Sequence, residues 1–332
     1  MSGALLLFAL AIGLMAVGQF GLARAAWPQR SPRLGIAQWR ALTTGVVACL
    51  VLGSLALALP GLSAASTVGE LLRACLVELR RQFSHPQGAV VSSIGIGLVL
   101  LLVTRITVSL TRARRSTNLT RRNHRSSLSI VAEEPQPGLY TLDTRAVAVY
   151  CVPGDRAANV RDAVVVTRGA IETLTAEQLR LVLGHERAHL RSRHDRLVAR
   201  ANALAVALPW LPFFWVAHEQ IACLAEMHAD DAAPEGDRPT LADALYRLSA
   251  ASSNAPPALG GLAAAGSSTA LRISRLLAHP GPLRMPGVAL VRAGIVALAL
   301  APAALALVPT GLELTHDCCV VTLDAKPQAT DG

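Results

Sequence analysis

The segment that organises this chain is TAEQLRLVLGHERAHL, residues 175–190. Thr175 followed three positions later by Gln178 is a capping box, in which the two side chains satisfy free backbone amides at the start of a helix. A leucine on either side of the box is placed to form a hydrophobic staple. The sequence therefore predicts a helix that begins at this box and carries the run His185-Glu186-Arg187-Ala188-His189.

The HExxH run has the spacing of a metal site. Residues four apart on a helix lie on one face, so His185 and His189 can offer ring nitrogens to one ion. Glu186 lies beside them, where its carboxylate reaches a water on the metal instead of the metal itself. Zinc lowers the pKa of such a water, and the carboxylate takes up its proton. We expect Glu186 to be the catalytic base and to pass that proton to a leaving amine.

A catalytic zinc has three protein ligands and one open position. The downstream run from Glu226 to Asp231 offers several donors. Its spacing favours Glu226 as the third ligand, with Asp230 one turn later, where it can hold a ligand histidine through the second ring nitrogen. His228 is the competing ligand, and Cys223 is a more remote one.

The metal helix lies in a segment, 139–278, whose pattern predicts a small α+β domain. The short β-branched runs at 146–152 and 163–167 are bounded by turn residues and are typical of strands. We expect the second of these strands to be the sheet edge that binds an extended peptide beside the metal helix. Between helices, the stretch 203–217 is broken by two prolines, so we expect a turn on the membrane surface with its aromatic residues at headgroup depth.

The rest of the chain indicates a membrane protein. Hydrophobic residues make up 52% of it and charged residues 16%, and the mean hydropathy is +0.43. Four apolar runs have about the 20 residues that a helix needs to cross a bilayer. They predict spans at 3–23, 41–59, 88–108 and 288–308, an Arg/Ser-rich juxtamembrane linker at 111–138, and a short tail at 309–332.

The net charge of +9 comes almost wholly from arginine, which is concentrated at 24–40, 112–125 and 272–284. The positive-inside rule then places both termini outside and the zinc domain in the cytoplasm, at a bacterial inner (plasma) membrane. The segment 111–129 holds six arginines and no aromatic residue. Membrane lipid is therefore the expected partner there, not nucleic acid. A homo-oligomer stays possible.

The six cysteines show no CxxC or other regular spacing, so they indicate neither a zinc knuckle nor a disulfide framework. The expected topology places Cys75, Cys318 and Cys319 on the oxidising side of the membrane. We expect Cys75 to pair with one of the other two, while Cys151 and Cys223 remain in the reducing cytoplasm.

Several runs together resemble the BlaR/MecR family of membrane antirepressor metallopeptidases. They are LTAEQ at 174–178, HERAHL at 185–190, Arg193-His194, and Glu226-x-x-Ala229-Asp230-Asp231-Ala232. The strand at 164–169, the basic segment at 271–277 and the order of three spans, domain and one span also fit.

The resemblance implies a gluzincin fold with Glu226 as third ligand and Asp230 in contact with a ligand histidine. It also implies a cytoplasmic winged-helix repressor of the BlaI/MecI kind as substrate. The chain departs from the best-known members because the 23 residues from Thr310 include no Ser-x-x-Lys motif of a penicillin-binding sensor domain.

Two other functions fit the same residues. A CAAX-type or HtpX-like zinc protease that acts in membrane-protein quality control shares HExxH and the downstream glutamate. A receptor or scaffold that binds zinc without catalysis would instead close the metal site with a fourth ligand, and His228 or Cys223 would supply it.

Overall fold

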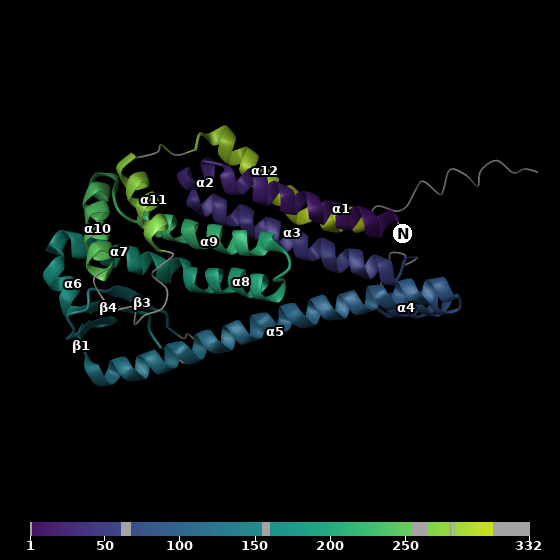
Figure 1. The fold of residues 1–332 in the computed structure, drawn as a ribbon, viewed down its shortest axis with the longest axis horizontal. Helices are drawn as coiled ribbons and strands as arrows, with labels where there is room; N and C mark the ends of the chain where they lie inside the picture. Colours follow the sequence, from purple (N-terminus) through teal and green to yellow (C-terminus); the bar gives the residue numbers. More distant parts are fainter. Residues whose placement is uncertain are drawn as a thin grey trace, which may run out of the picture.

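The computed structural model describes residues 2–60, 68–154, 160–253, 265–278, 281 and 283–307. Four of its helices are long and apolar enough to cross a membrane, at Gly3–Arg24, Pro32–Ala58, Pro86–Leu128 and Met285–Ala306. They run side by side in an elongated bundle with an α+β domain at one end (Figure 1). The expected architecture is confirmed, with the domain inserted between the third and fourth of these helices.

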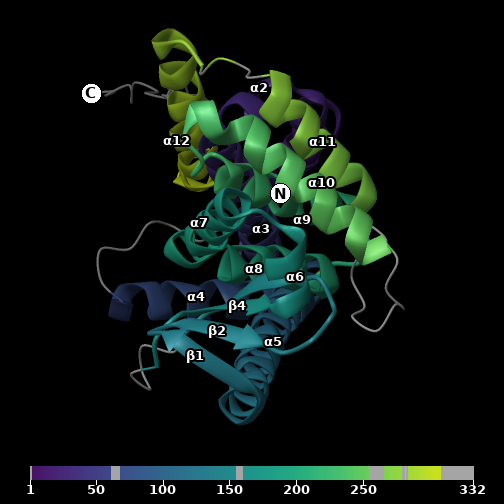
Figure 2. The same ribbon diagram turned by 90° about the vertical axis from the view of Figure 1, so that its left-hand side faces the viewer.

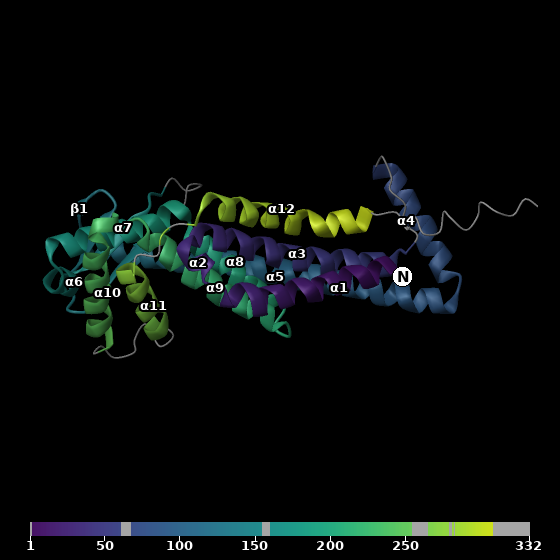
Figure 3. The same cartoon turned by 90° about the horizontal axis from the view of Figure 1, so that it is seen from above.

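The helices of the spanning part have the following bounds. They are α1 (Ser2–Ala16) with its irregular continuation to Arg24, α2 (Trp27–Arg30), α3 (Pro32–Ala58), α4 (Val68–Phe83), α5 (Pro86–Val131) and α12 (Met285–Leu307). Seen from above, α12 lies along α3, and α4 crosses the bundle at the end away from the domain (Figure 3).

The domain elements are β1 (Ala132–Gln136), β2 (Leu139–Leu142), β3 (Val149–Val152), β4 (Ala163–Thr167), α6 (Arg168–Thr173), α7 (Ala176–Ser192), α8 (His194–Ala207), α9 (Pro212–Asp230), α10 (Arg238–Ser253) and α11 (Ala265–Ala278). The sheet lies between the end of α5 and the helices α7 and α8, as Figure 2 shows from the domain end.

Helix α5 differs from the expectation of a linker at 111–138. The helix continues without a break to Val131, and strands β1 and β2 follow it at once. The physical reason is local, because the stretch 109–131 contains neither glycine nor proline and arginine is a good helix former. The arginine-rich segment is therefore a rigid extension of the third span.

The sheet has the order β1-β2-β4-β3. Strand β4 pairs with β2 in parallel and with β3 in antiparallel, and all five of its residues are buried. The expectation that the 163–167 strand forms the sheet edge is therefore wrong, because both of its hydrogen-bonding sides are occupied. Its run of small and β-branched residues is that of a central strand. The edge next to the metal helix is β3.

The hairpin of α8 and α9 packs into the same core as the spans. Trp39 of α3 is fully buried, with its ring centroid 6.1 Å from that of Phe213. A Cβ at Gly18 would lie 2.5 Å from the Phe213 ring, so α9 approaches bare backbone there. The expected turn is present at 208–211, but Phe213 and Phe214 are buried in the protein core and do not face lipid. Only Trp210 and Trp215 are exposed, by 52% and 40%.

Several expectations fall outside the described residues. The tail at 309–332, with Cys318 and Cys319, is one of them, so the pairing of Cys75 stays a prediction. Within the described part of the chain Cys49, Cys75, Cys151 and Cys223 are free. The orientation of the four spans also stays a prediction.

Candidate metal centre

Two helices from different parts of the chain supply the centre. On α7, the capping box forms as expected, because Thr175 Oγ1 accepts from the amide of Gln178 at 3.2 Å and Gln178 Oε1 accepts from the Thr175 amide at 2.9 Å. Helix α7 ends at Arg193, which has a left-handed φ of 50°. The chain turns there into α8, and α9 then brings its last two turns back against α7.

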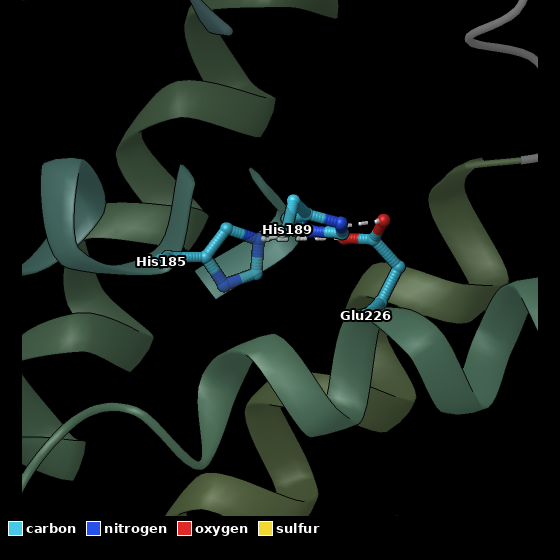
Figure 4. Close-up of side chains that lie close together, drawn as sticks. All are labelled: His185, His189 and Glu226. Carbon is cyan, nitrogen blue, oxygen red and sulfur yellow. Dashed lines mark hydrogen bonds and ion pairs between the residues drawn. The ribbon is translucent and has the colours of Figure 1, made fainter. Parts of the chain in front are cut away.

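His185, His189 and Glu226 point their ligand atoms toward one another (Figure 4). All three atoms lie within 4.8 Å of one another. The two Nε2 atoms are 3.1 Å apart, and each lies 3.5 Å from an oxygen of Glu226. Two imidazoles and one carboxylate form the donor set of a catalytic zinc site, with the fourth position left open. The residues present therefore fit zinc.

The tautomer of His185 is set by Asp230. Asp230 is fully buried, and its Oδ1 lies 3.0 Å from Nδ1 of His185. A carboxylate at this position favours a proton on Nδ1 and leaves Nε2 free to bind a metal. This is the contact that the one-turn spacing between Glu226 and Asp230 predicts.

Arg272 of α11 is a component of the centre that the sequence did not reveal. Arg272 is 8% exposed, and its guanidinium donates from Nε and Nη2 to the two oxygens of Asp230 at 2.9 and 2.7 Å. Its Nη1 lies 2.9 Å from Glu226 Oε2. Arg272 belongs to the basic segment noted before the last span, but no spacing rule connects it with residues more than 40 positions upstream.

A chain of imidazoles leads away from His189. His189 Nδ1 lies 3.0 Å from Nδ1 of the buried His194, and His194 Nε2 lies 2.9 Å from His228 Nδ1. If the metal is on Nε2 of His189, its Nδ1–H donates to His194, which then donates its own Nε2–H to His228. His228 is therefore placed as an outer hydrogen-bond partner, and the metal-competent group of described residues includes neither His228 nor Cys223.

Burial and charge shift the acid–base properties of the two glutamates in opposite directions. Burial raises the pKa of Glu186, and the neighbouring histidines only partly oppose this shift. Burial also acts to raise the pKa of Glu226, but hydrogen bonds from His185 and His189 and the charge of Arg272 hold it well below its usual value. Glu226 is thus an anion suited to a cation, while Glu186 is suited to taking up a proton.

Comparisons with known proteins agree with this geometry. Residues 145–250 match the model of Peptidase family M48. A protease HtpX homolog of Levilactobacillus brevis is 33% identical over 87 residues, which are 26% of this chain and 28% of that protein. A protease HtpX homolog of Streptococcus pneumoniae is 32% identical over 84 residues, 25% of this chain and 27% of that protein. No solved structure matches.

The chain spans only about a quarter of the length of these relatives. The match to the family model includes both metal-binding helices. The match makes residues 145–250 similar to the zinc peptidase domain of Peptidase family M48, in a membrane protein with four candidate spans. These findings favour the HtpX-like alternative. The BlaR/MecR subtype, its repressor substrate and a signalling role have no support in them.

Proposed function

We propose that this chain is a membrane-embedded zinc metalloendopeptidase of the HtpX-like kind, which cuts polypeptides at or near the membrane surface. The observation that carries the proposal is the convergence of His185, His189 and Glu226, with the half-buried Glu186 next to His185 on helix α7. The match of residues 145–250 to Peptidase family M48 supports it independently.

Each residue of the centre has a separate task in this proposal. A zinc ion held by His185, His189 and Glu226 would polarise the scissile carbonyl and an attacking water. Glu186 takes the water proton and delivers it to the leaving amine, for which its raised pKa suits it. Asp230 orients His185, and Arg272 compensates the charge of Asp230 and Glu226.

Strand β3 is the proposed site for the substrate backbone. Within the described sheet β3 pairs only with β4, so its other side offers free backbone groups. It also packs on α7. A peptide added there as a further strand would run past the metal centre. A cavity of about 210 Å³, lined by Cys151 and Pro153 on one side and His189 and Glu226 on another, is placed to accept a flanking side chain.

The closeness of the domain to the spans supports a substrate near the membrane. One hydrophobic core joins residues of α1 and α3 with residues of α8 and α9, and α9 supplies Glu226. A domain docked in this way lies close to polypeptide segments that emerge from the bilayer. We therefore expect such segments, and not freely diffusing proteins, to be its main substrates.

The cytoplasmic winged-helix repressor is the second candidate substrate. The observation in its favour is the position of α11, which carries Arg272 and precedes the last span α12. Arg275, one turn later, donates to the Gln29 carbonyl at 2.7 Å and to Asp231 at 2.6 Å. Helix α11 thus joins α2, which lies next to the first spans, to the end of the ligand helix α9, and this suits a peptidase switched on by a membrane event.

The test is proteolysis by the full chain, reconstituted in liposomes, with three kinds of substrate. An HtpX-like enzyme cuts several unfolded membrane proteins. An antirepressor instead cuts a single winged-helix repressor encoded nearby, and a zinc-binding scaffold cuts nothing. Metal analysis of Glu226→Ala and His228→Ala accompanies it, and only Glu226→Ala should lose zinc. Zinc loss in His228→Ala alone would exclude the proposed ligand set.

A further inference from the structure

A groove runs between helices α5 and α8. Of these two helices, only α8 contributes a residue to the metal centre, His194. Two cavities form the groove, of about 270 and 490 Å³, and they share Ala113 as a lining residue. Figure 1 shows the two helices side by side along this stretch. We call the two cavities together the α5–α8 groove and distinguish an arginine half from an apolar half.

The arginine half is the smaller cavity. Arg114 and Arg121 reach it from α5, and Arg196 and Arg200 reach it from α8. Arg121 forms an ion pair with Asp195. In the part of the chain that the structure describes, Arg114, Arg196 and Arg200 form no ion pair and are exposed. Three uncompensated cations on two facing helices form a site for an anion.

The apolar half is the larger cavity, and its lining includes Val108, Ala203, Val206, Ala207 and Arg112. Its exposed lining is mostly apolar, and Val206 itself is 50% exposed. A surface of this kind is costly to leave in water but is normal against hydrocarbon.

Specific contacts join the two helices that form the walls of the groove and fix the distance between them. Arg105 Nε donates to the Ala207 carbonyl at 2.8 Å, and its guanidinium lies 4.9 Å from the Trp210 ring centroid. Ser109 Oγ donates to the Ala203 carbonyl at 2.7 Å. Together with the Arg121–Asp195 pair at the other end, these contacts make the groove a preformed feature and not a gap left by loose packing.

The order of the two halves along α5 matches the layers of a bilayer. The apolar run of α5 ends near residue 108, within the stretch 104–116 that lines the apolar half. The arginine half is lined by α5 residues between 110 and 121, so it overlaps the apolar half and extends further from the apolar run. Side chains in this position lie at the depth of lipid headgroups, where arginine attracts anionic phosphate.

We propose that the α5–α8 groove binds an anionic phospholipid. Its phosphate lies among Arg114, Arg196 and Arg200, and an acyl chain follows Val108 and Val206 toward the bilayer. A nucleic acid is not favoured, since no aromatic side chain lines the arginine half to stack a base. The proposal does not depend on proteolysis, because it rests on residues that the metal centre does not use.

The test is lipid retention by the purified full chain in detergent, measured by native mass spectrometry after addition of phosphatidylglycerol or phosphatidylcholine. We expect the wild type to retain phosphatidylglycerol selectively. Arg114→Gln/Arg200→Gln should weaken retention by about tenfold or more, since each arginine near a membrane surface contributes appreciably to binding anionic lipid. The matched control Arg115→Gln/Arg122→Gln removes two exposed arginines of α5 that do not line the groove and should retain the lipid.

Ala199→Phe provides a second variant, because it fills the arginine half without changing charge. It should lose phosphatidylglycerol to the same extent, and its zinc content reports that the domain is folded. Equal losses in the groove and control variants would mean general attraction to positive charge and would overturn the site. Full displacement of the lipid by millimolar inorganic phosphate would show a phosphate site without an acyl component, and would also overturn the proposal.

Discussion

The metal centre and the α5–α8 groove both use arginine, but in opposite ways. Arg272 is buried and contacts two carboxylates, so its charge is fully compensated inside the protein. Arg114, Arg196 and Arg200 line an open groove and form no ion pair with a described residue. The first arrangement holds protein groups in place. The second leaves its charge available for something outside the protein.

This difference predicts where a substitution affects folding and where it affects only binding. A buried charge that loses its partner is costly, whereas an exposed arginine contributes little to stability. The predictions below compare the two regions, beginning with the largest expected effect.

Glu186→Gln should lower proteolysis by about 10²–10⁴-fold, because it removes the proton acceptor, while zinc content stays at the wild-type level. Peptide cleavage and metal analysis of the same preparation measure the two quantities. Glu177→Gln, an exposed change on the same helix, is the control and should keep full activity. Zinc loss in Glu186→Gln would show that this residue is a ligand and not a base.

Arg272→Met should lower the free energy of unfolding by about 3–5 kcal/mol, because it leaves the fully buried Asp230 and the partly exposed Glu226 without their cation. Denaturant unfolding of the full chain in detergent micelles measures this value. Arg114→Met in the groove should change it by less than about 0.5 kcal/mol. If the two variants lower the free energy of unfolding by similar amounts, the arginines of the metal centre and of the groove do not differ in their contribution to stability.

His194→Ala should weaken zinc binding by about 10–100-fold, as is typical when the hydrogen-bond partner of a ligand histidine is lost. Competition with a zinc-binding dye measures the affinity. His194→Asn keeps a side chain that can accept from His189 Nδ1–H and should restore part of the loss. If His194→Ala binds zinc as tightly as the wild type, the imidazole chain has no role in holding His189.

Zinc binding at pH 7.5 should release about one proton from the centre. Asp230 and Glu226 together outweigh burial and raise the pKa of His185 to about 9 in the metal-free protein. The imidazole is therefore protonated below that pH and must lose its proton to bind zinc, so zinc affinity rises as the pH rises toward 9. Calorimetry in buffers of different ionisation enthalpy counts the protons, and a heat that is independent of the buffer would contradict this assignment.

Features that depend on residues close together in the chain could be predicted from the sequence. The capping box and HExxH specify one helix, and the run from Glu226 to Asp231 supplies the candidates for the third ligand, with Asp230 one turn after the favoured Glu226. Four apolar runs specify the candidate spans. Each of these depends on a single helix and its period, so residues close in sequence carry all the information.

Only the tertiary structure decided how the helices meet. The pairing of Arg272 with Asp230, the imidazole chain from His189 to His228 and the α5–α8 groove all join residues of different elements. Strand β4 became central, and not an edge, because β2 pairs on its second side. Contacts of this kind depend on packing angles and on which faces are buried together. These are properties of the whole core, and no local period in the chain encodes them.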